Sequence, residues 1–166
     1  ASACSSVLLW YFRTVSEMLS LIPFLMGNIV REVFYRCTLA SCGKNVMVAF
    51  GTVLHYRGIN VGSNVLIGLY STIHHCDIGN DVLIEDGCRL ISGSRHYNCS
   101  RTDIPMAKQE GFMRKIRIEN DVWIGANCVI MADVGRGSVI GAGGVVSNGV
   151  ENFSVCIGNP AKMIKK

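Results

Sequence analysis

The chain has 166 residues, a net charge of +4 at neutral pH, and a hydrophobic content of 49%. Its length fits one domain, or one domain with an appendage, and its dispersed basic residues argue against a nucleic-acid partner. The high hydrophobic content predicts apolar surface that is buried against copies of the chain or against a membrane.

Residues 1–40 are predicted to form a helical, amphipathic segment. Residues 1–26 are mostly apolar, but charges interrupt the run and Pro23 ends it. The run is therefore too short and too charged for a transmembrane span, and it lacks the features of a signal peptide. Two compatible interpretations stay open. The helix caps the end of the domain, or it rests on a membrane with Trp10 and Arg13 near the headgroups.

From residue 61 onward, apolar residues recur every six positions. They are Val61, Ile67, Ile78, Ile84 and Leu90, followed by Ile118, Ile124, Ile130, Ile140 and Val146. A period of six fits one short strand and one turn, and three such repeats complete a triangular coil with the aliphatic side chains stacked inside. The sequence predicts an all-β solenoid over residues 41–156. An antiparallel β-sandwich is the less favoured alternative, because sandwiches alternate with period two and space their turns more widely.

The positions between these aliphatic residues follow a pattern of their own. Gly or an acid comes next, as at Gly62 and Glu85, and Asn or Asp often follows, as at Asn64 and Asp81. Because Gly tolerates tight turns, we expect the glycines to form the corners of the coil. A small or β-branched residue, expected to point inward, comes four positions after most of the aliphatic ones. These residues are Val65, Ser71, Val82, Cys88, Val122, Cys128, Val134 and Gly144.

Two segments depart from the period. Residues 92–115 form a polar excursion, which we expect to protrude from the solenoid. Between Ile130 and Gly141 the repeat is two residues short, so a turn must tighten there. Residues 157–166 are predicted to form a turn and a short basic end.

A solenoid has a filled interior, so its sites are expected in protruding loops and between copies. His96 lies near the start of the excursion, and a histidine can accept a proton at neutral pH, although a lone loop histidine is more often a plain surface residue. His74 and His75 lie where the repeat slips. They are interpreted as turn residues or, with a third histidine, as ligands of zinc. The eight cysteines form no CxxC pair, which favours a reduced, cytoplasmic protein.

Residues 120–125, 139–146 and 158–162 resemble the hexapeptide-repeat acyltransferases, whose fold is a left-handed parallel β-helix. The resemblance covers roughly residues 40–166 and is strongest to the maltose/galactoside-type and colanic-acid/exopolysaccharide-type O-acetyltransferases. It implies acetyl-CoA as co-substrate, a sugar or glycan acceptor, free or lipid-linked, and a homotrimer with each active site between two β-helices. It also implies bacterial polysaccharide biosynthesis, in the cytoplasm or at the inner face of the membrane.

The resemblance also implies roles for individual residues. His96 would be the general base that deprotonates a sugar hydroxyl for direct attack on the thioester. Glu85 and Asp77 are candidates for orienting its imidazole, and no metal takes part. The implied acetyl-CoA contacts are Trp123 on the pantetheine, backbone at Gly125, Ala126 and Ala142, Ser147 and Asn148 near the adenosine, and Lys162 and Lys165 on the phosphates.

Three other functions stay open. In the first, the chain would be an acetyltransferase whose acceptor is an amine, on a nucleotide sugar or on serine. In the second, the chain would be a γ-type carbonic anhydrase, because residues 75–79 resemble one of its ligand strands. However, Arg101 stands where that enzyme would need a third histidine. The third is a non-catalytic scaffold, which would not bind acetyl-CoA.

Overall fold

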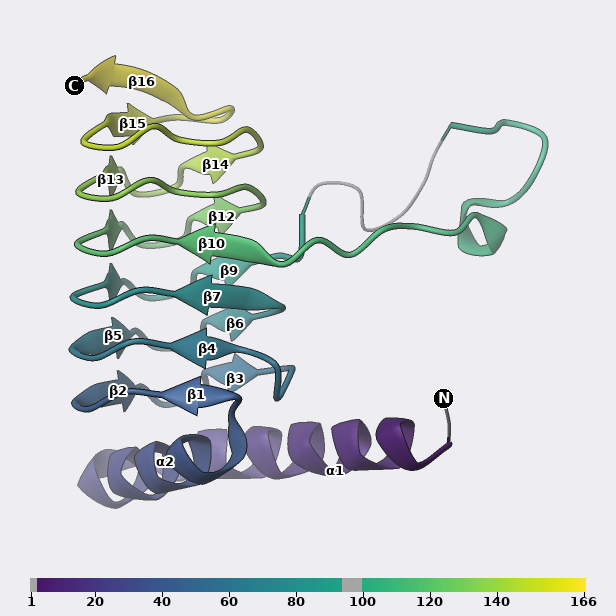
Figure 1. The fold of residues 1–166 in the computed structure, drawn as a ribbon, viewed down its shortest axis with the longest axis vertical. Coiled ribbons are helices and arrows are strands. Elements are labelled where there is room, and N and C mark those ends of the chain that lie inside the picture. Colours follow the sequence, from purple (N-terminus) through teal and green to yellow (C-terminus); the bar gives the residue numbers. More distant parts are fainter. Residues whose placement is uncertain (1–2, 94–99) are drawn as a thin grey trace.

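The structure, a computed structural model, describes residues 3–93 and 100–166. It is a parallel β-solenoid that stands on two helices, α1 (Ala3–Ser20) and α2 (Phe24–Thr38) (Figure 1). The solenoid predicted from the period of six is therefore confirmed, and the β-sandwich is excluded.

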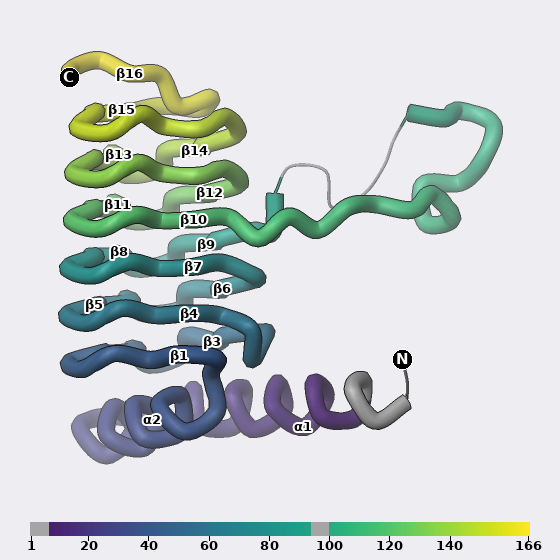
Figure 2. The backbone as a smooth tube through the Cα atoms, in the orientation of Figure 1, coloured from purple at the N-terminus to yellow at the C-terminus, as the bar shows by residue number. Residues whose placement is uncertain are grey.

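Three sheets form the three faces of the solenoid, and the chain passes from one to the next at each corner (Figure 2). Face A contains β1 (Ser41–Cys42), β4 (Asn60–Val61), β7 (Cys76–Ile78) and β10 (Ile116–Ile118). Face B contains β2 (Val46–Val48), β5 (Val65–Ile67), β8 (Leu83–Ile84), β11 (Trp123–Ile124), β13 (Val139–Ile140), β15 (Val155–Ile157) and β16 (Lys162–Lys165). Face C contains β3 (Val53–Leu54), β6 (Thr72–Ile73), β9 (Arg89–Leu90), β12 (Val129–Ile130) and β14 (Val145–Val146).

Neighbouring strands on a face are parallel and in register, so equivalent residues of successive coils lie one above another. Ile67 on β5 is paired with Ile84 on β8, and both side chains are fully buried. The smaller inward positions are filled as expected, since Ser71, Cys88 and Cys128 are all buried. Among the strands of residues 3–93 and 100–166, only β16 runs antiparallel, against β15.

Irregular spacing is confined to the corner between face C and face A, called here the C–A corner. Inward residues are six positions apart from face A to B and from face B to C in every coil. From Ile130 to Val134, across the C–A corner, the spacing is four. Val134 bridges Ile118 and Val150 in the adjacent coils, so it is the inward residue of face A. Its assignment to the small inward position was wrong.

The repeat glycines lie at the corners of the coil, as expected, but the left-handed backbone at these corners belongs to other residues. Left-handed backbone occurs at Asn64 and Asp81, with φ of 58° and 59°, whereas Gly62 lacks a positive φ. Asn and Asp adopt this conformation more readily than other residues with a side chain. Gly62 instead allows one coil to approach the next, because a Cβ there would lie 2.4 Å from the carbonyl oxygen of Gly79.

The excursion leaves the solenoid after β9 and returns at β10, extending well away from the stack (Figure 1). Its outer part contains a short 3-10 helix, η1 (Met106–Lys108). The Gln109 amide closes this part by donating to the carbonyl oxygens of Arg101 (2.7 Å) and Ile104 (3.2 Å). The predicted protrusion is thus an arm with its own hydrogen bonds.

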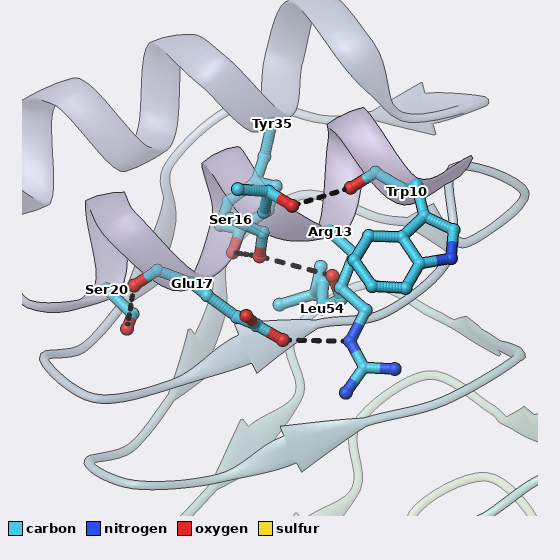
Figure 3. Close-up of polar contacts among 8 residues, drawn as sticks. Trp10, Arg13, Ser16, Glu17, Ser20, Tyr35 and Leu54 are labelled. Carbon is cyan, nitrogen blue, oxygen red and sulfur yellow. Dashed lines mark hydrogen bonds and ion pairs between the residues drawn. The ribbon is translucent and has the colours of Figure 1, made fainter. Parts of the chain in front are cut away.

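The two helices pack side by side against the first coil of the solenoid (Figure 2). Ser16 joins them to it, since its hydroxyl lies 2.7 Å from the Tyr35 hydroxyl on α2 and donates to the carbonyl oxygen of Leu54 on β3 at 3.1 Å (Figure 3). The helical layer therefore covers the open end of the stack. Among the residues that the structure describes, none of the helices is long and apolar enough to cross a membrane.

Candidate active site

Trp123 lies on the outer surface of face B, where its side chain is half exposed. It is paired with Leu83 on one side and with Val139 on the other. The same outward column continues through Met47, Leu66 and Val155, so that it is apolar from β2 to β15. Trp123 therefore belongs to an apolar stripe along the whole of face B.

Gly125, Ala126 and Ala142 lie at the next corner, between faces B and C, called here the B–C corner. A Cβ on Gly125 would lie 2.6 Å from the backbone nitrogen of Ala142, so these residues are directly stacked. The N–H of Gly125 donates to Ile140 and its carbonyl accepts from the Cys88 thiol. Because its N–H is engaged inside the solenoid, Gly125 would contribute close approach to a cofactor and no donated hydrogen bond.

The N–H of Ala126 is in a different situation. At the equivalent position two coils earlier, the N–H of Leu69 donates to the carboxylate of Asp86, 2.6 Å away on the next coil. Above Ala126, the position equivalent to Asp86 is occupied by Ala142, which has no carboxylate to accept the N–H of Ala126. The N–H groups of Ala126 and Ala142 therefore have no acceptor among the described residues. Two open donors therefore lie one coil apart, close to Trp123.

Ser147 and Asn148 follow β14 and lie at the C–A corner, across face C from Ala142. They line a cavity of about 350 Å³, together with the two ends of the excursion at Gly93 and Arg114. The Arg114 guanidinium makes an ion pair with Asp133 beside this cavity. The sequence did not indicate Gly93 or Arg114, although the place where an excursion leaves a solenoid could have suggested them.

Lys162 and Lys165 are both exposed on β16. A register shift in the pairing with β15 places Lys162 opposite Ile157 and Lys165 opposite Val155, so the two lysines lie on the same side of the sheet. Their predicted contact with the phosphates of acetyl-CoA therefore stays a prediction, which this shared side is compatible with. Lys166, which was not predicted, is bonded to Glu151 at 2.7 Å.

His96, the predicted base, lies outside the described residues. Its excursion leaves the stack between β9 and β10, at the C–A corner (Figure 2). Gly93 and Arg114 there line the same cavity as Ser147 and Asn148. Face C separates this corner from Trp123, Ala126 and Ala142, called here the Trp123 group. Of the two candidate orienting acids, Asp77 is engaged by Lys115 and Asn60, each 2.5 Å away. Burial opposes ionisation of Asp77, but these two partners outweigh it and lower its pKa. Glu85 lies at the B–C corner, away from the root of the excursion.

The remaining histidines gather at the C–A corner below the excursion. The rings of His55 and His74 stack with centroids 4.6 Å apart, and the N–H of His75 donates to the Ser92 hydroxyl at 3.0 Å. Burial, helped by His74 and Arg13, lowers the pKa of His55 to about 4, so this imidazole is neutral at neutral pH. Within the described residues, no three metal-ligating side chains come together.

The structure is similar to solved acetyltransferases of the hexapeptide-repeat type. A hexapeptide-repeat-containing acetyltransferase from Vibrio cholerae, complexed with acetyl-CoA, matches with a TM-score of 0.84 and 23% identity over 100% of this chain and 90% of that one. A galactoside acetyltransferase in complex with coenzyme A matches with a TM-score of 0.80 and 25% identity, over 95% of this chain and 82% of that one.

Sequence comparison gives the same class of protein. The Mycobacterium tuberculosis protein "Probable acetyltransferase Rv3034c" is 29% identical over 118 residues, which are 67% of this chain and 38% of the relative. The "Probable macrolide acetyltransferase" of Lysinibacillus sphaericus is 47% identical over 105 residues, 54% of this chain and 58% of the relative. The chain thus spans less than two thirds of these two relatives. No family model matches it. The resemblance predicted from the sequence is nevertheless confirmed, because the chain has the left-handed parallel β-helix of the hexapeptide-repeat acetyltransferases and the proteins similar to it are acetyltransferases.

Proposed function

We propose that the chain is an acetyl-CoA-dependent O-acetyltransferase that modifies a sugar hydroxyl. The two open N–H groups at Ala126 and Ala142, next to the exposed ring of Trp123, carry the proposal. The pantetheine arm of acetyl-CoA has amide carbonyls that accept such hydrogen bonds and an apolar chain that packs on an indole. The solved neighbours crystallised with acetyl-CoA or coenzyme A support this assignment of the cofactor.

In the proposed reaction the His96 imidazole takes the proton from the acceptor hydroxyl. The oxygen attacks the thioester carbonyl, the carbon–sulfur bond breaks, and coenzyme A leaves as a thiolate that recovers the proton from the imidazole. General-base catalysis of this kind contributes about 10²–10⁴-fold, and the positioning of both substrates contributes much of the rest. No covalent enzyme intermediate and no metal are needed.

The proposed site would be formed between copies of the chain. Within one chain, the root of the excursion and the Trp123 group lie on opposite edges of face C. The apolar stripe on face B extends along the whole stack, which fits a neighbouring solenoid lying parallel to it. A homotrimer would bring the excursion of one copy to the Trp123 group of the next. An acceptor bound there would contact residues of two chains.

Three classes of acceptor are candidates for the proposed site. A maltose O-acetyltransferase and a galactoside acetyltransferase among the structural neighbours favour a sugar, and a surface polysaccharide unit, free or lipid-linked, fits this class. The relative that is 47% identical carries the name of a macrolide acetyltransferase, which favours a hydroxyl on an antibiotic as a second candidate. An N-acyltransferase among the structural neighbours keeps amino sugars in the test, although it is only 19% identical.

The test measures thiol release from acetyl-CoA in the presence of sugars, amino nucleotide sugars and macrolides. We expect release that depends on one class of acceptor and that falls at least about a hundredfold in His96→Ala. Arg101→Ala, on the same excursion, is the control and should retain wild-type activity. Equal release by wild type and His96→Ala would contradict the assigned base. Absence of both release and acetyl-CoA binding would favour a non-catalytic scaffold.

A further inference from the structure

The outward faces of α1 and α2 form one apolar surface, called here the helical floor. It is made by Tyr11, Met18, Leu21, Leu25, Ile29 and Val33, whose side chains are 49–71% exposed. The opposite sides of the helices carry the buried contacts to the solenoid, at Phe12 and Ser16 on α1 and at Arg31 and Tyr35 on α2. An apolar face of this extent on a surface layer indicates a binding surface.

The connection between the two helices is the most exposed part of the floor. Together with the first turn of α2 it reads Leu-Ile-Pro-Phe-Leu-Met over residues 21–26, and there is no charged residue between Glu17 and Arg31. Phe24 is 87% exposed and Met26 67%. This segment is called here the apolar tip.

Buried hydrogen bonds fix the backbone of the apolar tip. Arg31, which is fully buried, donates from Nη1 to the carbonyl oxygens of Leu19 (2.9 Å) and Ile22 (2.8 Å) and from Nε to that of Val48 (2.8 Å). Gly27 lets the helix approach this turn, because a Cβ there would lie 1.9 Å from the Ile22 carbonyl oxygen. The side chains of the tip are therefore presented by a fixed backbone.

Phe24 also has a strained backbone, with a φ of 59°. This conformation is unfavourable for a bulky residue, and such strain tends to persist at functional positions. Phe153 offers a comparison, since its φ is 58° and its ring lies over Gly137 in the preceding coil. Phe153 has a packing reason for its conformation within the solenoid, whereas the ring of Phe24 faces outward.

The charges near the helical floor that have no ion-pair partner among the described residues are positive. The only carboxylates before Asp77 are Glu17 and Glu32, and each forms an ion pair with an arginine on its own helix. Lys44 and Arg57, on the first coil that packs on the inner side of the helices, are exposed and make no ion pair among the described residues. An apolar surface flanked by unpaired bases is complementary to anionic lipid.

We propose that the helical floor and the apolar tip bind the surface of an anionic lipid bilayer, with both helices lying in its plane. Two copies of the chain meeting floor to floor would bring together two layers of net positive charge, because Glu17 and Glu32 are already paired with arginines on their own helices. The bilayer is therefore the occupant that the charges favour. The proposal goes beyond acetyl transfer and does not depend on it.

The first experiment is flotation of the full chain with vesicles of phosphatidylcholine, alone or mixed with phosphatidylglycerol. We expect binding to the mixed vesicles and a loss of at least about tenfold in Phe24→Ser/Leu25→Ser, because two large apolar groups no longer enter the interface. Phe153→Ser, which removes an exposed phenylalanine of similar φ at the far end of the stack, should bind like the wild type. Circular dichroism of each variant checks that it is folded.

The second experiment tests the charges. Lys44→Gln/Arg57→Gln should lower affinity for the mixed vesicles by about tenfold or more, since each base near an anionic surface contributes about 1 kcal/mol. Failure of the folded wild-type chain to bind either vesicle would overturn the proposal. So would end-to-end association that Phe24→Ser/Leu25→Ser abolishes while vesicle binding is unchanged, because the floor would then be an interface between copies.

Discussion

Arg31, in the middle of α2, donates from Nε to the carbonyl oxygen of Val48 in the first coil, at a distance of 2.8 Å. The same guanidinium donates to the Asn28 side chain on its own helix at 2.7 Å, to the carbonyl of Leu19 in the last turn of α1, and to that of Ile22 just after it. One buried cation therefore joins both helices to the solenoid. Burial lowers its pKa, but an arginine remains charged at any physiological pH.

Replacing Arg31 with Met should destabilise the fold strongly. The carbonyl oxygens of Leu19, Ile22 and Val48 would lose their donor, and each buried group left unpaired costs about 1–3 kcal/mol. We expect a loss of about 3 kcal/mol or more in the free energy of unfolding by urea. Arg36→Met on the same helix removes only an exposed ion pair with Glu32 and should cost less than about 1 kcal/mol. Similar losses in both variants would contradict the role given to Arg31.

Replacing Ala142 with Asp should close the proposed cofactor site while leaving the solenoid intact. The new carboxylate would accept from the N–H of Ala126, as Asp86 does from Leu69. It would also repel the negatively charged cofactor. Calorimetry should show acetyl-CoA affinity reduced at least about tenfold, which is about 1.4 kcal/mol, with the urea midpoint unchanged or higher. Ala142→Ser, which adds no charge, is the control. Wild-type affinity in Ala142→Asp would remove this corner from the proposed site.

Adding a side chain at Gly125 should strain two coils. The Cβ of Gly125→Ala would lie 2.6 Å from the backbone nitrogen of Ala142, and backbone on both sides leaves little room to move. Overpacking of this kind costs about 1–3 kcal/mol, to be measured by urea unfolding. At Gly149 the nearest atom to an added Cβ would be 3.9 Å away, so Gly149→Ala should be nearly neutral. Equal stability of the two variants would show that the stack accommodates the methyl group.

Acid should weaken the fold through His55. Its pKa is lowered to about 4 in the folded chain, against an ordinary value of 6.5. Between these two pH values the unfolded chain binds a proton that the folded chain does not, so stability is full above pH 6.5 and decreases as the pH falls toward 4. His55→Phe keeps a ring beside His74 and should flatten the decline of the urea midpoint with falling pH. An unchanged slope in this variant would assign the effect to other groups, such as His75.

A charge on the apolar stripe of face B should prevent the proposed trimer from forming. Leu83→Glu places a carboxylate beside Trp123 on face B, where the proposed neighbour would bury it. Sedimentation should show a trimer for the wild type and a monomer for this variant. Thr72→Glu, an equivalent addition on face C, should remain trimeric. A monomeric wild type would contradict the proposed assembly, and a trimeric Leu83→Glu would move the interface away from face B.

The stack of coils could be predicted because the same inward aliphatic position recurs in every coil. Ile84 and Ile124 are forty positions apart, yet both occupy the same inward place, because the period of six resumes after the excursion that separates them. The corners were harder to predict. A glycine is needed both for a left-handed turn and for close approach of backbones, and the sequence does not distinguish Gly62 from Gly137, which does have a positive φ of 67°.

The candidate site could be predicted only in part. Trp123 and Ala142 were found through a family pattern, whereas the open N–H of Ala126 results from an absent carboxylate one coil away, which becomes evident only once the coils are aligned. Arg31 looks like a surface charge on an amphipathic helix, because the carbonyls that it bonds are contributed by two other segments. Contacts of that kind depend on the tertiary packing of the helices against the stack.

Every change in the length of a coil falls at the C–A corner, so the excursion at this corner can vary independently of the B–C corner. Residues gained or lost there leave the six-residue steps to faces B and C unchanged, so neighbouring coils stay in register. Lengthening such a loop is inexpensive, since each doubling costs only about 0.6 kcal/mol in closure entropy. The excursion can therefore be exchanged for another of different length while the B–C corner is preserved. In the proposed enzyme, acceptor choice could diversify in this way without altering recognition of the acyl donor.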